Sequence, residues 1–500
     1  MNARRVVVRN ALASVVQVVV SGVVLFVLYR SLILRLGQAR VGVWSLVLAV
    51  TAVTRISDLG FAASAIRFVA RLRAEGDEVG AAVAQETAVV SVALAVAVLA
   101  LLGGAGCLWL LPRLVDALLL PEAISILPLS LVSLWLGAIA AAVAAGLDGV
   151  MRVDVRSSLG VAGNVLYLAA ALALTPGEGL MGLAVAQCLQ GGVVAIGGWW
   201  LLRRELVHLP LFPWRVNAVH FRRMLSYGAS FQAVSVTNWL LEPATKVLLA
   251  KFGTLGQVAY FEMASRMVSQ VRMLLVSSFQ VLVPVFAGLE LQGDDRVRSA
   301  YRRANGVMWL LGAPVFSLLA IGAPVLAWVW IGKPDYEFTM SAQLAVGGWA
   351  ANTVVVPAYV VNLGTGELRL NTLSHVVIGV FNLVLGSALG WAFGGRAVVA
   401  GWSAALVAGS VVLLFGFHRR YALGWRDVVP GGSRILAGGC LVLGVSGAIW
   451  SLRNAAVGGT RLSAVAVLVA AMPVVLGLMW GSAGRSELLS WVTGRLKANI

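Results

Sequence analysis

Residues 304–331 read ANGVMWLLGAPVFSLLAIGAPVLAWVWI, a stretch without a single Asp, Glu, Lys or Arg. A helix of about 20 apolar residues crosses the roughly 30 Å hydrocarbon core of a bilayer while it satisfies its own backbone hydrogen bonds. The stretch is long enough for this and has no charge to keep it in water. It therefore predicts a membrane-spanning helix.

Similar stretches recur along the whole chain. Hydrophobic residues make up 60% of it and charged residues 12%, and the mean hydropathy is +0.91, whereas a soluble domain is about one quarter charged. We therefore predict an all-α integral membrane protein with about fourteen transmembrane helices. The predicted spans are residues 11–34, 41–66, 81–111, 125–148, 159–176, 180–202, 226–250, 257–288, 304–331, 338–362, 372–394, 397–417, 434–452 and 462–482.

The basic residues fix the predicted orientation of these spans. The net charge is +17 and the isoelectric point is near 10.9, which in a soluble protein would suggest nucleic acid. Most Lys and Arg residues, however, fall in alternate loops, as positively charged cytoplasmic loops do. We predict a multi-pass protein of the cytoplasmic (inner) membrane with both termini in the cytoplasm, and no nucleic-acid partner.

An internal repeat is visible at an offset of 216 to 218 residues, and Arg55 with Arg272 and Arg30 with Lys246 are among its matched pairs. This offset spans six helices, so it predicts two lobes in the same orientation, related by a pseudo-twofold axis along the membrane normal. We predict an N-terminal lobe at 1–202, a basic cytoplasmic linker at 203–225, a C-terminal lobe at 226–417, and two appended spans with a cytoplasmic tail at 418–500.

Motif residues in both lobes resemble those of a known family, the multidrug/oligosaccharidyl-lipid/polysaccharide (MOP) exporter superfamily. The resemblance is to its polysaccharide-transport branch of Wzx-type flippases in particular. In the first lobe the motif residues are Leu36, Gly37, Gly42, Trp44, the run Asp58 to Phe61, and Arg67 to Asp77; in the second lobe they are Phe252, Gly253, Gly256, Tyr260, Ala264 and Pro284. The two appended spans depart from a twelve-span pattern and are similar to those of the fourteen-span lipid II flippases. The exact substrate therefore stays open.

The resemblance implies a two-lobed transporter that moves a polyprenyl-pyrophosphate-linked oligosaccharide from the inner to the outer leaflet by alternating access. The implied substrate carrier is undecaprenyl pyrophosphate. Membrane lipids, a coupling ion that is a proton or Na⁺, and polysaccharide-assembly proteins are the further partners that we expect.

Charged residues inside spans are costly and commonly face a cavity or a partner. Arg55 and Arg272 lie well inside spans 2 and 8, and Arg30 and Lys246 lie near the outer ends of spans 1 and 7. Two repeat-related pairs of cations suit the negative charges of a pyrophosphate. The alternative is that Arg30 and Lys246 extend to the membrane surface and that Arg55 and Arg272 pair with nearby acids.

Acidic residues lie at helical spacing from several of these cations. Asp58 follows Arg55 by three residues, Glu242 precedes Lys246 by four, and Glu262 precedes Arg266 by four. Such pairs either neutralise one another or serve coupling and gating. We assign Glu242 and Asp58 to coupling or gating, because Glu242 lies near mid-span beside polar Asn238, and we include Arg266 among the substrate-binding candidates.

A polar stripe runs along span 1 through Asn10, Ser14, Gln17 and Ser21. The spacing of four, three and four residues places these side chains on one helix face. Such a stripe suits a water-filled cavity or hydrogen bonds between helices. We favour the cavity, and we include Gln17 and Asn238 among the residues that would contact the pyrophosphate and sugars.

Two rival functions remain. A cation-coupled multidrug exporter of the same superfamily would favour an acidic cleft, and a membrane polymerase or ligase would need a long outer loop, which the spans do not leave. No GxxxxGK[ST] or HExxH motif occurs, and the four histidines and three cysteines are dispersed. We expect no enzymatic activity, no cofactor and no metal site.

Overall fold

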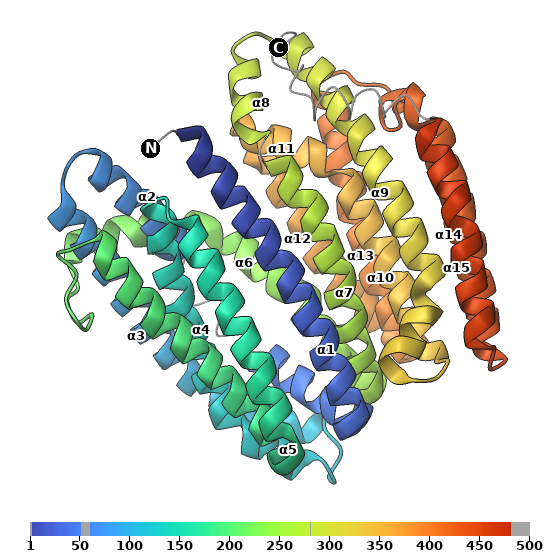
Figure 1. Cartoon of the computed structure of the whole chain (residues 1–500), viewed down its shortest axis with the longest axis horizontal. Coiled ribbons are helices and arrows are strands. Elements are labelled where there is room, and N and C mark those ends of the chain that lie inside the picture. The colour runs from blue at the N-terminus through green and yellow to red at the C-terminus, as the bar shows by residue number, and fades with distance from the viewer. Residues whose placement is uncertain (1–2, 52–60, 281, 482–500) are drawn as a thin grey trace. The chain divides into compact units, whose positions relative to one another are not determined.

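The computed structural model describes residues 3–51, 61–280 and 282–481, with the backbone alone for residues 3–12, 14–15, 62–63, 226–239 and 284. Arg55 and Asp58 lie outside the described residues. Long helices dominate (Figure 1). They are α1 (Ala3–Thr51), α2 (Phe61–Ala74), α3 (Glu78–Leu110), α4 (Leu120–Gly149), α5 (Val153–Glu205), α6 (Ala218–Phe252), α7 (Leu255–Gln280), α8 (Val283–Glu290), α9 (Asp294–Ile331), α10 (Tyr336–Val354), α11 (Val356–Gly364), α12 (Leu368–Phe393), α13 (Gly395–Arg420), α14 (Arg434–Ala456) and α15 (Arg461–Trp480).

The helices confirm the predicted class of all-α membrane protein. Ten of the described helices are long and apolar enough to cross a membrane, and each predicted span overlaps a described helix. Over the described ranges the chain has no strand. The apolar pattern alone therefore located the spans, because a helix in lipid must be apolar along its whole length.

Two of the long helices bend between consecutive predicted spans: α5 contains spans 159–176 and 180–202, and α1 contains span 11–34 and the first part of span 41–66. Helix α1 bends at Gly37, whose φ is 79°, and α5 bends at Gly179, whose φ is 56°. A side chain at a positive φ meets its own carbonyl, so glycine is the residue that permits so sharp a turn without an intervening loop. Each bend joins two consecutive spans.

Two spans are broken in ways that the hydropathy pattern did not predict. Predicted span 10 divides into α10 and α11 at Val355, and predicted span 8 divides into α7 and α8. Pro357 occupies the first turn of α11 and has no backbone N–H to donate to the preceding turn. The residues at the break, Val355 and Val356, are buried.

The chain divides into two compact units, Met1–Ala259 and Tyr260–Ile500. The division falls inside α7, whereas the repeat places the lobes at 1–202 and 226–417; those lobe boundaries stay a prediction. In the first unit, α2, α3 and α4 share an apolar core with the end of α5. There Gly42 of α1 approaches Leu255 so closely that a Cβ would collide with the Leu255 carbonyl, which explains one of the motif glycines.

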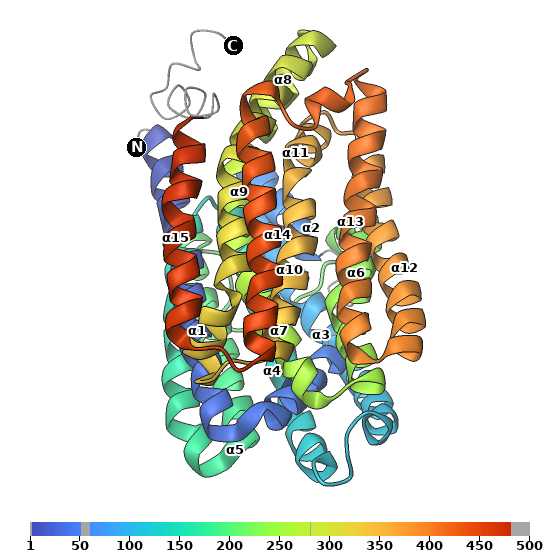
Figure 2. The ribbon, with the colours of Figure 1, turned by 90° about the vertical axis from the view of Figure 1, so that its right-hand side faces the viewer.

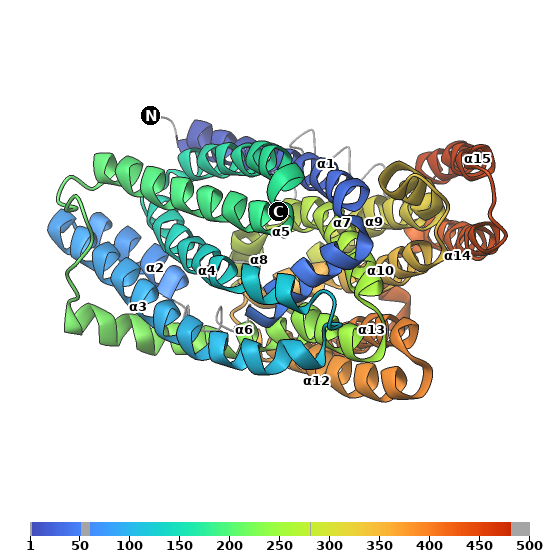
Figure 3. The same cartoon turned by 90° about the horizontal axis from the view of Figure 1, so that it is seen from below.

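In the second unit, α12 packs along α13, as Figure 3 shows in the view from below. The two appended helices, α14 and α15, run side by side (Figure 2) and both pack on α9. Ser317 of α9 donates a hydrogen bond to the Cys440 carbonyl of α14 at 2.7 Å. The appended helices are therefore an integral part of the second unit.

Candidate functional site

The candidate site lies in the second unit around Arg272 of α7. The Nη2 atom of Arg272 donates a hydrogen bond to Oδ1 of Asn352 at 2.7 Å, and the guanidinium lies over the Trp349 ring at 4.7 Å from its centroid. The amide of Asn352 donates in turn to the Ser410 hydroxyl at 3.3 Å. The cation is thus held by neutral groups from α10, and α13 supports them.

Helices α11 and α12 each add one group to this cluster. Tyr359, just past the Pro357 break, and His375 of α12 lie within electrostatic range of Arg272. The rings of Tyr359 and His375 meet edge to face, with centroids 5.9 Å apart. Asn371 fixes the α11 backbone by donating to the Tyr359 carbonyl at 3.1 Å. The broken span therefore places an aromatic ring near the cation, and α12 adds an imidazole.

Arg272 retains a free charge and a free donor. Among the described residues no carboxylate lies within ion-pair distance of it, and its buried Nε has no hydrogen-bond partner there. An arginine fork binds two oxygens of one anion in parallel, most strongly where water is scarce. The arrangement can therefore hold a phosphate or carboxylate, with the Trp349 and Tyr359 rings beside it.

Arg266, on the same helix, has a different environment. Its Nε donates to Oε1 of Glu262 at 3.0 Å, and Glu262 is only 2% exposed whereas Arg266 is 47% exposed. The sequence spacing predicted this pair. Arg266 was also included among the substrate-binding candidates, and the structure gives it a carboxylate partner, so its charge is compensated within the protein.

The remaining predicted cations lie in the first unit. Arg30 is exposed on α1, whereas Lys246 on α6 is buried with 5% exposure. Glu242, one turn before Lys246, is half-buried. The backbone of Asn238 belongs to α6, but its side chain is outside the described part, as are Arg55 and Asp58 entirely. The roles assigned to these residues stay predictions.

Of the polar stripe of span 1, Gln17 and Ser21 face α5, whereas the side chains of Asn10 and Ser14 lie outside the described part. Asn164 of α5 donates to the Ser21 hydroxyl at 2.6 Å and accepts from Gln190 at 2.8 Å. The Gln17 side chain packs on Gly160, where a Cβ would contact the Gln17 amide. These contacts are hydrogen bonding and close packing between helices, the alternative to a cavity that the sequence left open.

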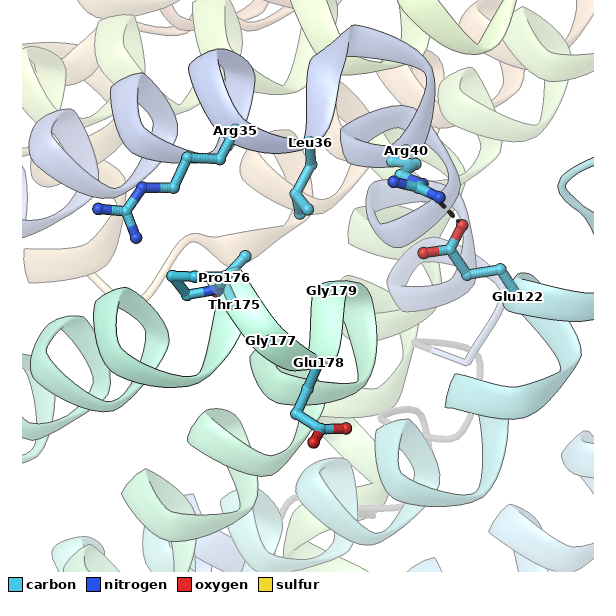
Figure 4. Close-up of a pocket in the computed structure, with 9 residues that line it drawn as sticks. All are labelled: Arg35, Leu36, Arg40, Glu122, Thr175, Pro176, Gly177, Glu178 and Gly179. Atoms are coloured by element: carbon cyan, nitrogen blue, oxygen red, sulfur yellow. Dashed lines mark hydrogen bonds and ion pairs between the residues drawn. The ribbon is translucent and has the colours of Figure 1, made fainter.

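A cavity of about 730 Å³ opens between the bends of α1 and α5, and the sequence did not predict it (Figure 4). Arg40 and Glu122 form an ion pair at 2.9 Å on its wall, and Arg35 donates to the Leu172 carbonyl at 2.9 Å. The positive φ of Gly179 turns the chain at its edge. The sequence signal was only that Arg35 and Arg40 flank Gly37; Glu122 comes from the first turn of α4, about eighty residues away.

Comparisons with known proteins agree with this architecture. The model of a family described as "Polysaccharide biosynthesis protein" matches residues 7–290. No curated protein matches the sequence.

Solved structures are similar in fold over most of the chain. A multidrug resistance MATE family transporter of the MOP superfamily, in an inward-facing conformation, has a TM-score of 0.66 at 16% identity and covers 80% of this chain and 94% of its own. The lipid II flippase MurJ, in an inward closed conformation, has a TM-score of 0.68 at 10% identity. The match covers 94% of this chain and 98% of the MurJ chain. At such identities the likeness concerns the fold alone. Because the family model matches more than half of its length, the chain belongs to the polysaccharide biosynthesis protein family, and it has the fold of MOP-superfamily transporters.

Proposed function

We propose that this protein is a flippase that moves a polyprenyl-pyrophosphate-linked oligosaccharide from the inner to the outer leaflet by alternating access, for export of a surface polysaccharide. The family supports a role in polysaccharide biosynthesis, and the fold is that of membrane transporters and flippases. Neither names the substrate. The argument for the substrate class depends on the chemistry around Arg272.

The observation that carries the proposal is a half-buried arginine, with a buried Nε, whose partners are neutral. Asn352 occupies one nitrogen of the Arg272 guanidinium, and Nε remains available. A buried cation without a counter-ion is costly, so an anion from the substrate is a favourable partner. The pyrophosphate supplies that anion. We propose three further cations for this head group: the repeat-related Arg55, Arg30 and Lys246.

The other parts of the substrate also have matching surfaces in the second unit. The Trp349 and Tyr359 rings beside Arg272 offer flat apolar faces on which sugar rings can stack. An apolar groove of about 320 Å³ lies between α7, α9 and α15, lined by residues that include Leu275, Pro314 and Met472. Its lining suits a segment of hydrocarbon chain, because apolar surface is best covered by apolar groups.

The alternative is a cation-coupled multidrug exporter. A cationic drug would need a carboxylate where Arg272 lies, and the described surroundings of Arg272 supply amide, hydroxyl and aromatic groups instead. We therefore place the flippase first. A membrane polymerase or ligase is the candidate from a different class, and no observed cluster favours it.

The decisive test is transport by an Arg272→Ala variant. Full-length protein is reconstituted in liposomes that contain undecaprenyl-pyrophosphate-linked oligosaccharide labelled on its sugar, and the label that reaches the opposite leaflet is measured. Loss of the guanidinium removes a buried charged contact, so the rate should fall about 30-fold, equivalent to ~2 kcal/mol.

The matched control is Arg298→Ala, which removes an arginine that pairs with Asp295 at the start of α9. This variant should flip the lipid at the wild-type rate. Equal rates for Arg272→Ala and wild type would refute the anion site. Preferential transport of a cationic dye over the lipid would favour the exporter.

A second test concerns energy coupling through Glu242. If Glu242 couples transport to a proton, Glu242→Gln should bind the lipid-linked sugar but lose its response to an imposed pH gradient. If Glu242 only compensates Lys246, the double variant Glu242→Gln with Lys246→Gln should recover what the single variant lost, since no unpaired charge then remains in the membrane.

The proposed topology has both termini and the 203–225 linker in the cytoplasm, in the inner membrane. Reporter enzymes fused after Ile500 and within the linker test it. A cytoplasm-specific reporter should be active at both positions. Activity of a reporter that works only outside the cytoplasm would reverse the orientation.

A further inference from the structure

Side chains of neighbouring helices form hydrogen bonds with the backbone of the segment between α5 and α6. Glu86 of α3 is 2% exposed, and its Oε1 accepts hydrogen bonds from the backbone N–H groups of Trp214 at 2.9 Å and Arg215 at 2.8 Å. The neighbouring Thr87 hydroxyl accepts from the Asn217 N–H at 3.1 Å. A buried carboxylate in the third turn of a long apolar helix is costly without such donors.

The preceding turn is held from α5 in the same way. The indole Nε1 of Trp199 donates to the carbonyls of Pro210 at 3.2 Å and Leu211 at 3.0 Å. Arg203 donates to the Leu209 carbonyl at 3.2 Å. Side chains of α3 and α5 hold the backbone of this segment, and Leu206 and Leu209 pack into the core, whereas the side chains of Leu211, Phe212 and Trp214 do not.

Those side chains project outward, and they are apolar and basic. Phe212 is 73% exposed and Trp214 is 69% exposed, with Leu211 also exposed beside them. The Arg215 guanidinium lies over the Trp214 ring at 5.0 Å. Arg222 and Arg223 are exposed in the first turns of α6. We call Leu211, Phe212, Trp214, Arg215, Arg222 and Arg223 the linker surface.

The Glu86 carboxylate below the linker surface accepts backbone N–H groups and forms no ion pair with the described linker arginines. No Asp or Glu occurs between Glu205 and Glu242 in the sequence, and Glu205 pairs with Arg152. Within the described residues, Arg215, Arg222 and Arg223 form no ion pair. In contrast, Arg71 and Arg73 at the end of α2 pair with Glu75 at 2.8 Å and Glu78 at 3.3 Å.

We propose that the linker surface binds the anionic phospholipid headgroups of the leaflet in which it lies, with Phe212 and Trp214 inserted among the acyl chains below the phosphates. The segment joins the end of one membrane-spanning helix to the start of the next, so it lies at the membrane surface. Aromatic rings prefer that depth, and arginines attract anionic lipid there. The three arginines without an ion-pair partner among the described residues complement the charge of the anionic headgroups. The aromatic pair sets the depth at which the segment lies in the leaflet.

The test measures contact between the linker surface and lipids of defined headgroup. Full-length protein with Cys107→Ala, Cys188→Ala, Cys440→Ala and Val207→Cys is labelled with bimane; Val207 is 81% exposed and adjoins the surface. The protein is reconstituted in phosphatidylcholine vesicles that contain a small fraction of spin-labelled phosphatidylglycerol or spin-labelled phosphatidylcholine. Quenching by the anionic lipid should exceed quenching by the zwitterionic lipid about threefold, and about 1 M salt should suppress the excess.

Two variants separate charge from insertion. The triple variant Arg215→Gln, Arg222→Gln and Arg223→Gln should abolish the preference for phosphatidylglycerol, whereas the control Arg71→Gln with Arg73→Gln should keep it because those arginines are already paired. Phe212→Ser with Trp214→Ser should lower quenching by both lipids and leave their ratio unchanged. Equal quenching by the two lipids in the unmodified surface would overturn the proposal.

Persistence of the preference for phosphatidylglycerol in the triple variant would also overturn the proposal. Suppression of that preference by inorganic phosphate at constant ionic strength would overturn it as well, because it would show a site for the free ion. Unfolding transitions of each variant in detergent, compared with the parent, show that it is folded. Because no oligosaccharide is present, the outcome is independent of the proposed flippase activity.

Discussion

Helix α7 carries two arginines less than two turns apart, and they differ in what neutralises them. Arg266 pairs with the buried carboxylate of Glu262, whereas Arg272 has the Asn352 amide and the Trp349 ring. A buried ion pair is costly to break, and a buried cation without a counter-ion is available to an external anion. Two residues of one type on one helix can therefore serve stability and ligand binding separately.

The largest effect should come from breaking the pair. Arg266→Gln removes the ion-pair partner of the Glu262 carboxylate, which is 2% exposed, and the free energy of unfolding should fall by about 3 kcal/mol. SDS-induced unfolding in mixed micelles measures this. Glu262→Gln with Arg266→Gln should recover most of the loss. A single variant as stable as wild type would mean that the pair contributes nothing.

A lysine in place of Arg272 keeps the positive charge but removes the parallel N–H donors of the guanidinium. Arg272→Lys should slow flipping of the lipid-linked oligosaccharide about tenfold, or ~1.4 kcal/mol, because an ammonium group does not present parallel donors to one phosphate. Its unfolding should match wild type, in contrast to Arg266→Gln. A wild-type transport rate would show that only the charge matters and would remove the argument for a bidentate contact.

The ring beside Arg272 should contribute less. Trp349→Leu removes the cation–π contact at 4.7 Å and should raise the KM for flipping about fivefold, or ~1 kcal/mol. The control is Trp391→Leu, since Trp391 is 83% exposed and lies far along the chain on α12. An unchanged KM in Trp349→Leu would restrict the recognition of substrate to the guanidinium.

The smallest effect should come from an exposed pair outside the membrane. Arg302 donates to Asp427 at 2.7 Å, and this contact lowers the pKa of Asp427 below its ordinary value of 3.8. The stabilisation is therefore present above that value and is lost as the pH falls through the folded-state pKa. Arg302→Gln should destabilise by less than about 1 kcal/mol near pH 6 and by nothing near pH 2. A loss that persists in acid would point to packing instead of charge.

The fold was largely predictable because a membrane span is a local property. Length and apolarity placed residues 304–331 within α9, and each other span overlaps a helix in the same way. The break at Val355 was not predicted, because Pro357 is apolar and does not interrupt the hydropathy pattern. The linker was predicted as a basic segment, yet its anchor at Glu86 was not predicted, since Glu86 lies more than a hundred residues earlier.

The candidate site was predictable only in part. Arg272 was identified because a charge inside a span is rare, and Glu262 with Arg266 because four residues bring side chains to one helix face. Asn352 and Trp349 were missed, since they come from another helix about eighty residues away. The same reasoning grouped Arg266 with the substrate-binding residues, although its partner was the carboxylate on its own helix.

The sequence by itself determined the helices, their apolar faces and the i,i+4 pair of α7, because these depend on residues close together along the chain. The tertiary structure decided which charges stay uncompensated. A counter-ion must lie within about 4 Å, and that distance depends on which helices pack together. For Arg272 the packed neighbours are an amide and an indole, and the linker arginines form no ion pair within the described part of the chain, so we propose that both retain their charge for a ligand.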